Sequence, residues 1–166
     1  SPRAAYAAMI TRLDASIGRL MQVLRELGVD RNTLVVFTSD NGPLFDRLGG
    51  TDSAFFNSAA GLRGRKGSLH EGGVRVPCIV RWPGLRWTGV SDRVTGFEDW
   101  LPTLLELAGG RDLVPPDVDG ISFVPTLLGR RQRERPFLYR EFPGYGGWQA
   151  VWRGDWNLVR HRPRPG

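Results

Sequence analysis

Lysine, cysteine and histidine are scarce in this sequence of 166 residues. Of its 23 basic residues 22 are arginine, so Lys66 is the single lysine; there is one cysteine, Cys78, and there are two histidines. One cysteine excludes a disulfide within the chain, and the apolar neighbours of Cys78 predict a buried structural residue. An arginine bias on this scale is typical of a whole genome, so the lone lysine stands out as a candidate functional residue.

Long hydrophobic runs are also missing. No stretch approaches the roughly 20 apolar residues that a membrane-spanning helix needs, and no signal peptide is visible. The chain begins at Ser1 rather than at a methionine, and we interpret both ends as cut from a longer protein. Because 40% of the residues are apolar, the chain is too apolar for disorder. The sequence therefore predicts a folded domain, or a large piece of one, without a membrane partner.

The net charge of +6 first suggests a nucleic-acid partner. However, residues 1–129 carry 14 basic and 14 acidic residues, and the whole excess lies in residues 130–166. No zinc-finger, homeodomain or RNA-recognition pattern accompanies it. We expect a solvated arginine-rich surface and no nucleic-acid partner, while a non-catalytic module that binds polyanions through Arg130 to Arg135 stays open as an alternative.

Periodicity in the first half of the chain predicts alternating helices and strands. Apolar residues that recur every three or four positions predict an amphipathic helix over residues 4–28, with Met9 and Met21 in the core. Short, continuously apolar runs at residues 33–38 and 75–82 predict two buried strands, the first of them parallel to its neighbours. A helix followed by a buried strand is typical of an α/β fold.

The pattern changes near residue 130. Before it, two more helices are predicted, at 99–108 with Asp99 as its N-cap and at 122–128. After it, the alternation of apolar and polar residues predicts three short strands, at 137–142, 148–153 and 156–159. Gly154 and Asp155 suit a two-residue hairpin turn between the last two strands. We expect an α/β region followed by a small antiparallel sheet.

Asp40 and Asn41 lie just past the carboxyl end of the first predicted strand. Ligands bind at that edge in open α/β sheets, and a carboxylate beside an amide oxygen suits Ca²⁺ or Mg²⁺. The alternative is an ordinary turn, which the spacing alone favours. Two ligands do not complete a calcium site, and no second carboxylate cluster stands out.

The glycine-rich segment 61–73 is the second candidate site. Lys66 would present a compact ammonium group to an oxyanion. The planar guanidinium group of arginine matches a single oxyanion poorly. His70 is a weaker candidate, as a proton donor or an oxyanion contact. Both side chains also suit an ordinary loop, Lys66 as a solvated lysine and His70 as a hydrogen-bonded one. Glu71 and Arg75, four residues apart, are interpreted as a structural ion pair.

The order and spacing of four strings resemble the second half of a sulfatase of the arylsulfatase type, within the alkaline phosphatase superfamily. They are Phe-Thr-Ser-Asp-Asn-Gly at 37–42, Gly-Leu-Arg-Gly-Arg-Lys-Gly at 61–67, Glu-Gly-Gly-Val-Arg-Val-Pro at 71–77 and Arg-Trp-Pro-Gly at 81–84. Each string alone is weak. The resemblance implies the C-terminal part of an alkaline-phosphatase-like α/β sandwich over residues 1–130 and a small antiparallel β subdomain over residues 131–166.

The resemblance also implies a function. Such enzymes hydrolyse sulfate esters; Asp40 and Asn41 would complete a divalent metal site, usually Ca²⁺ with Mg²⁺ possible, and Lys66 would contact the sulfate. A phosphodiesterase or phosphonate hydrolase of the same superfamily is the alternative. The family alone suggests a periplasmic or extracellular location.

One essential part of such an enzyme is missing. The family's nucleophile is a formylglycine made from Cys or Ser in a Cys/Ser-x-Pro/Ala-x-Arg motif, and no such string occurs; Cys78 is followed by Ile-Val-Arg. We expect the formylglycine in an N-terminal half, which would be the partner of this chain. Alone, the chain is expected to turn over no sulfate ester and to bind calcium weakly. The substrate is not readable from the sequence.

Overall fold

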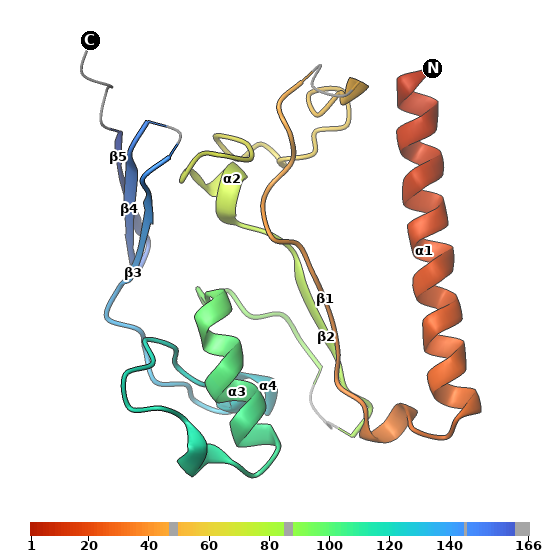
Figure 1. The fold of residues 1–166 in the computed structure, drawn as a ribbon, viewed down its shortest axis with the longest axis vertical. Helices are drawn as coiled ribbons and strands as arrows, with labels where there is room; N and C mark the ends of the chain where they lie inside the picture. Colours follow the sequence, from red (N-terminus) through yellow and green to blue (C-terminus); the bar gives the residue numbers. More distant parts are fainter. Residues whose placement is uncertain (47–49, 85–87, 145, 162–166) are drawn as a thin grey trace. The chain divides into compact units, whose positions relative to one another are not determined.

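The computed structural model describes residues 1–46, 50–84, 88–144 and 146–161 (Figure 1). The chain divides into two compact units, which are described separately. The first unit comprises residues 1–84, 140–150 and 158–166, and the second comprises residues 85–139 and 151–157. Among the described helices, none has the length and apolar character to cross a membrane.

A long helix, α1 (Pro2–Glu26), opens the first unit and confirms the helix predicted over residues 4–28. The Ser1 hydroxyl accepts a hydrogen bond from the Ala4 amide at 3.4 Å, which caps a free N–H group of the first turn. At the other end Gly28 adopts a φ of +70° and donates its amide to the Arg25 carbonyl at 3.0 Å. Glycine reaches this left-handed conformation without strain, so it ends the helix.

The apolar face of α1 is not buried, which contradicts the prediction for its methionines. No residue of α1 is buried, Met9 is 69% exposed and Met21 is half-buried. Contacts gather near its N-terminus, where Arg3 pairs with Asp52 at 2.7 Å and the Tyr6 ring lies 4.7 Å from that of Phe56. A helix buries its apolar stripe only against a second layer. The described residues do not supply that layer: within α1 only Ser16, Ile17, Met21 and Leu24 are half-buried, and the other residues are exposed.

Strands β1 (Val35–Thr38) and β2 (Cys78–Arg81) form an antiparallel pair in which Val35 lies opposite Arg81. Their positions agree with the predicted strands, but the prediction of buried, parallel strands is wrong. Buried parallel strands need helices on both faces of a sheet. This two-stranded sheet has no such cover within the described residues, and Ile79 is 60% exposed. Cys78, predicted to be buried, is exposed for the same reason.

Short helical turns complete both units. In the first unit η1 (Asp30–Asn32) precedes β1, and Asp30 forms an ion pair of 2.7 Å with Arg81 of β2. The single turn α2 (Glu71–Val74) precedes β2 in the same unit. The second unit contains η3 (Phe97–Asp99), α3 (Trp100–Leu107), η4 (Arg111–Leu113) and α4 (Val124–Leu127). The helices predicted at 99–108 and 122–128 are thus confirmed within two residues.

The second unit is organised around the buried carboxylate of Asp99, which is 1% exposed. It accepts hydrogen bonds from the amides of Gly96 at 3.0 Å and Ile121 at 2.7 Å, and it also pairs with Arg135. Asp99 stands at the N-cap position of α3 as predicted, but its side chain makes no cap hydrogen bond to that helix. Because η3 runs directly into α3, the carboxylate is free to bind loop amides instead.

Apolar packing surrounds this carboxylate. Thr103 is fully buried and receives the amide of Phe123 on its hydroxyl at 3.1 Å. The rings of Phe123 and Trp100 meet edge to face, with 4.8 Å between their centroids. Leu127 of α4, four positions after Phe123, is also buried. Aromatic pairs in this geometry add to the stabilisation that burial provides.

The end of the chain forms the predicted antiparallel sheet, with the order β3 (Leu138–Phe142), β4 (Trp148–Arg153), β5 (Trp156–His161). Gly154 has a φ of +54° in the turn between β4 and β5, as the Gly-Asp hairpin prediction requires. The division of the chain at residue 130 stays a prediction.

Candidate functional site

Asp40 and Asn41 directly follow β1, at the end of the strand where the sequence analysis placed them. Asp40 is exposed and Asn41 is half-buried. The Ser39 hydroxyl donates to the Asn41 carbonyl at 2.9 Å, which shapes this turn. The next residue, Gly42, donates its amide to the carbonyl of Gly73 at 2.9 Å. The turn is therefore attached to the glycine-rich segment that follows it in the sequence.

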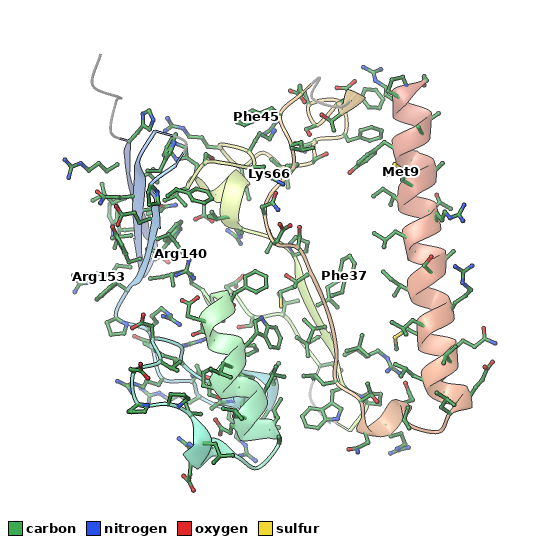
Figure 2. All side chains as sticks on the ribbon, in the orientation of Figure 1. Met9, Phe37, Phe45, Lys66, Arg140 and Arg153 are labelled. Atoms are coloured by element: carbon green, nitrogen blue, oxygen red, sulfur yellow. The ribbon has the colours of Figure 1, made fainter. Side chains whose placement is uncertain are left out.

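Lys66 lies in a loop that is closed on itself and joined to the same turn. The Gly72 amide donates to the Arg63 carbonyl at 2.7 Å, and the Lys66 amide donates to the Pro43 carbonyl at 2.9 Å. Figure 2 shows Lys66 on this loop, which leads into α2. The Lys66 side chain is exposed. Backbone hydrogen bonds thus bring the two predicted site segments together.

Glycines allow the two segments to approach this closely. A Cβ atom on Gly42 would collide with the Gly72 carbonyl, and one on Gly73 would collide with the Ser68 carbonyl. Gly64 has a φ of +88°, in the left-handed region that other residues avoid. The side chain of Ser68 is enclosed by this loop, and its hydroxyl is buried without a hydrogen-bond partner in the described structure. The glycine-rich composition is explained by backbone packing.

The side-chain oxygens of Asp40 and Asn41 are suited to be two of the ligands of a hard cation. Calcium takes 6–8 oxygen ligands, and a carboxylate and an amide oxygen are two of the types it prefers. Across the part of the chain that the structure describes, no group of three or more His, Cys, Asp or Glu side chains is arranged to hold a metal. The pair would therefore need further ligands from elsewhere.

His70 lies just before α2, and its ring meets the edge of Trp148 on β4, with 5.3 Å between ring centroids. Partial burial, and secondarily the charge of Arg63, lower the pKa of His70. The imidazole is therefore neutral at neutral pH, since its ordinary value is about 6.5. The sequence analysis did not single out Trp148, because a tryptophan that starts a strand is usually a packing residue.

The structure also tests the predictions for the Glu71–Arg75 pair and for Cys78. Glu71 and Arg75 form the predicted ion pair, with 3.7 Å between Oε2 and Nη1 across one helical turn. Cys78 does not provide a nucleophile for the site: it lies on β2, and although the residue is exposed, the protein atoms around its sulfur desolvate the thiolate and raise the pKa of the thiol. A raised pKa leaves little of the reactive thiolate at neutral pH.

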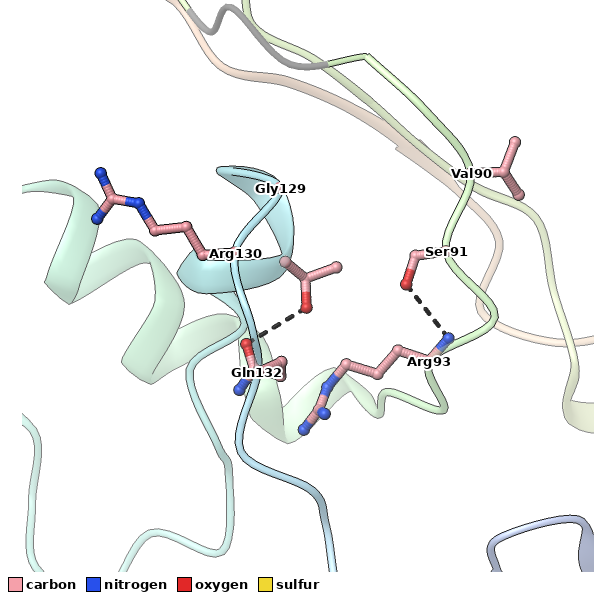
Figure 3. A pocket seen from close by; sticks show the side chains of 7 residues that line it. Val90, Ser91, Arg93, Gly129, Arg130 and Gln132 are labelled. Carbon is pink, nitrogen blue, oxygen red and sulfur yellow. Dashed lines mark hydrogen bonds between the residues drawn. The ribbon is translucent and has the colours of Figure 1, made fainter.

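A hollow of about 290 Å³ lies in the second unit (Figure 3). None of the residues predicted to bind the metal or the sulfate lines it, whereas Arg130, from the alternative polyanion-binding segment, does. Arg93 extends along one side, and its backbone amide donates to the Ser91 hydroxyl at 3.3 Å. The Nε and Nη2 atoms of Arg93 are buried without a partner within the described structure. The Arg130 side chain points away from Arg93 in this view, so the two guanidinium groups do not converge.

Comparison with known proteins identifies the family. The sulfatase family model matches residues 1–110, which hold both predicted site segments. The chain belongs to the sulfatase family. It is 41% identical to mouse (Mus musculus) steryl-sulfatase over 145 residues, which are 85% of this chain and 23% of that protein. It is 38% identical to human (Homo sapiens) arylsulfatase A over 147 residues, which are 86% of this chain and 27% of that enzyme.

Solved structures support the alkaline-phosphatase-like fold. A phosphonate monoester hydrolase from Silicibacter pomeroyi superposes with a TM-score of 0.71 at 24% identity, over 98% of this chain and 33% of that one. At this identity the likeness concerns the fold alone. The sulfatase chain thus spans about a quarter of the length of the curated relatives, and it corresponds to a third of the solved structure.

Proposed function

We propose that this chain supplies part of the active site of a metal-dependent sulfuric ester hydrolase of the arylsulfatase type. One observation carries the proposal. The hydrogen bonds from Gly42 to Gly73 and from Lys66 to Pro43 attach the loop of the single lysine to the turn that contains Asp40 and Asn41. The segment with a cation for a sulfate group and the segment with oxygens for a metal are thereby held together within the first unit.

In this proposal each residue has a distinct role. The Lys66 ammonium contacts a sulfate oxygen and stabilises the negative charge that develops there during hydrolysis. Asp40 and Asn41 hold Ca²⁺, with Mg²⁺ as the alternative, and the bound ion supplies Lewis-acid polarisation of the sulfate. His70, which is neutral and lies four positions after Lys66 in the sequence, is the weaker candidate for a hydrogen bond to the ester.

The remaining parts of the site belong to another segment in this proposal. No formylglycine motif occurs in the chain, so the nucleophile and the other metal ligands come from the N-terminal half of a sulfatase. The uncovered face of α1 is the surface that this half covers. Exposed Met9, Leu13 and Leu20 lie along it, and apolar helix faces of this size are normally packed against a second layer.

A chimera tests the assignment of Lys66. The matching C-terminal segment of human arylsulfatase A is replaced by this chain, and hydrolysis of 4-nitrophenyl sulfate is measured. We expect activity that falls by at least about a hundredfold in Lys66→Ala, as when one transition-state donor is removed from an active site. Lys66→Arg is expected to lose activity as well, because the guanidinium is larger and planar. Arg153→Ala, an exposed change on β4, is the matched control.

The isolated chain provides the complementary measurement. Without a nucleophile it should not hydrolyse 4-nitrophenyl sulfate, and its calcium affinity should be weak and should disappear in Asp40→Ala. Robust turnover by the purified chain, or a chimera whose activity is indifferent to Lys66, would contradict the proposal. Hydrolysis of a phosphonate ester in preference to the sulfate ester by the chimera would favour the alternative reaction.

A further inference from the structure

The hollow of the second unit has a positively charged lining (Figure 3). Arg93 and Arg130 carry the charge, and among the described residues that line the hollow none is acidic. The uncharged lining residues are Val90, Ser91, Thr126, Gly129 and Gln132. Its volume of about 290 Å³ is at the lower end of the range for small-molecule sites, roughly 300–1,000 Å³. The lining and the size together suit a small anion.

The end of the Arg93 side chain is buried without a counter-charge. Its Nε and Nη2 atoms have no hydrogen-bond partner within the described structure. Asp99, whose charge acts on Arg93, is already bound to two backbone amides and paired with Arg135. The charges of Asp99 and Glu134 favour the protonated guanidinium, but burial has the larger effect and lowers the pKa of Arg93. Buried charges are normally paired, so an anion from solution would complete this arrangement.

The unpaired atoms of Arg93 have the geometry of an oxyanion contact. Nε and Nη2 lie on one edge of the guanidinium plane, so their parallel N–H bonds can donate to two oxygens of one ligand. The Ser91 hydroxyl accepts the Arg93 amide at 3.3 Å, and its own proton has no acceptor among the described residues. A tetrahedral oxyanion has further oxygens for this donor, whereas a carboxylate has only two.

The wall that lies across from Arg93 in Figure 3 has a fixed shape. Gln132 donates from Nε2 to the Ser122 carbonyl at 2.9 Å and accepts the Thr126 hydroxyl at 3.3 Å. Arg130 on this wall is exposed and points away from Arg93. Its charge therefore attracts an anion without a direct contact, and Arg93 is left as the cation that binds it.

We propose that this hollow binds a small tetrahedral oxyanion, phosphate or sulfate, through the guanidinium group of Arg93. Nε and Nη2 are covered by protein atoms in the free chain, so the group turns toward the hollow as the ion enters. Unpaired buried donors cost free energy, which two charge-assisted hydrogen bonds to the ion recover. All lining residues belong to the second unit, whereas Asp40 and Lys66 belong to the first, so the inference does not rest on the proposed function.

An NMR titration of the chain at constant ionic strength tests the site, with sodium phosphate, sodium sulfate, methyl phosphate and sodium acetate as ligands. The side-chain Nε–H signal of Arg93, assigned by its loss in Arg93→Lys, reports the contact. We expect phosphate and sulfate to move this proton signal downfield with a Kd of about 1 mM, and acetate to bind at least about tenfold more weakly. Tighter binding of methyl phosphate than of inorganic phosphate would support an esterified ligand, and weaker binding would support the free ion.

Matched substitutions distinguish a site from general attraction to positive charge. Arg93→Gln should weaken phosphate binding at least about tenfold, followed at the Gly129 amide, because a charged donor is lost. Arg131→Gln removes the same charge from an exposed arginine that does not line the hollow, and it should leave the Kd within about twofold. Equal losses in the two variants, or acetate that binds as tightly as phosphate, would overturn the proposal.

Ser91→Ala provides a second variant that does not disturb a buried group, since Ser91 is exposed. It should weaken phosphate binding about threefold, and its circular dichroism should match that of the unmodified chain. An Arg93 Nε–H signal that stays unchanged with phosphate and with sulfate would overturn the proposal, whatever the behaviour of the variants.

Discussion

The two units of this chain differ in how completely they bury their own residues. The second unit encloses a carboxylate and a threonine, Asp99 and Thr103, and satisfies both with hydrogen bonds from surrounding loops. The first unit contains the longest of the described helices, yet α1 has no buried residue. In the β1–β2 pair, apolar side chains such as that of Ile79 are exposed to solvent. One unit is internally packed, and the other offers surfaces that its own described residues do not cover.

This difference separates structural polar groups from functional ones. In the second unit the charge of Asp99 is buried and paired with Arg135, as expected where a charge stabilises a fold. In the first unit the polar side chains of Asp40 and Lys66 are exposed, whereas the backbone beside them is hydrogen-bonded, through the Lys66 amide and through the amide of Gly42. Side chains left free on a firmly held backbone are available for a ligand.

The largest expected effect concerns Asp99. Asp99→Ala leaves the amides of Gly96 and Ile121 without their acceptor and Arg135 without its buried partner. Breaking a buried ion pair costs about 3–5 kcal/mol, so the free energy of unfolding should fall by that amount. Urea denaturation followed by circular dichroism measures it, with Asp112→Ala, an exposed aspartate, as the control. A loss below about 1 kcal/mol would show that Asp99 does not organise this unit.

A smaller effect is expected where the two site segments meet. Gly42→Ala places a Cβ atom against the Gly72 carbonyl, so the turn and the Lys66 loop must separate. We expect destabilisation of about 1–3 kcal/mol, as for overpacking elsewhere, and a loss of protection from hydrogen exchange at the Lys66 amide. Gly18→Ala is the matched control, because no atom lies within 4 Å of its Cβ position on α1. It should stabilise the helix by about 0.5–1 kcal/mol. An unchanged exchange rate at Lys66 in Gly42→Ala would argue against the close approach.

The smallest effect is expected on the uncovered face of α1. Met9→Ser should change the free energy of unfolding of the isolated chain by less than about 0.5 kcal/mol, as is usual for exposed positions. Leu127→Ser, at a buried position of α4, should cost several times more. Thermal unfolding of both variants measures the contrast. If the two substitutions were equally costly in the isolated chain, α1 would be packed in solution and the contrast between the units would fail.

Local signals in the sequence predicted the secondary structure well. The helix predicted over residues 4–28 corresponds to α1, which ends before Gly28, and the hairpin between β4 and β5 follows from Gly154. These features depend on residues within a few positions of one another, so periodicity and capping preferences suffice. The site segments around Asp40 and Lys66 were also found, because their strings resemble those of a family that the comparison then identified.

Burial was predicted incorrectly, and the hydrogen bonds of Asp99 are not those of a helix cap, although it stands at the predicted N-cap position. Apolar periodicity indicates which face of a helix prefers to be covered, but it does not indicate whether a covering layer is present. Met9 was therefore assigned to a core that the described residues do not form around it. Asp99 has the residue type of an N-cap, but its hydrogen bonds go to Gly96 and Ile121 because loops fold back over it. Such partners depend on the path of the whole chain.

Helix ends, turns and the family resemblance were thus set by the order of neighbouring residues, through backbone conformational preferences. Only the tertiary structure joined Gly42 to Gly73 and Lys66 to Pro43, and only it placed the Trp148 ring against the rings of His70 and His161. Contacts between distant positions require chain segments to meet in space. The physical reason is that backbone hydrogen bonds and glycine-permitted close approaches, rather than the site side chains themselves, hold these segments together.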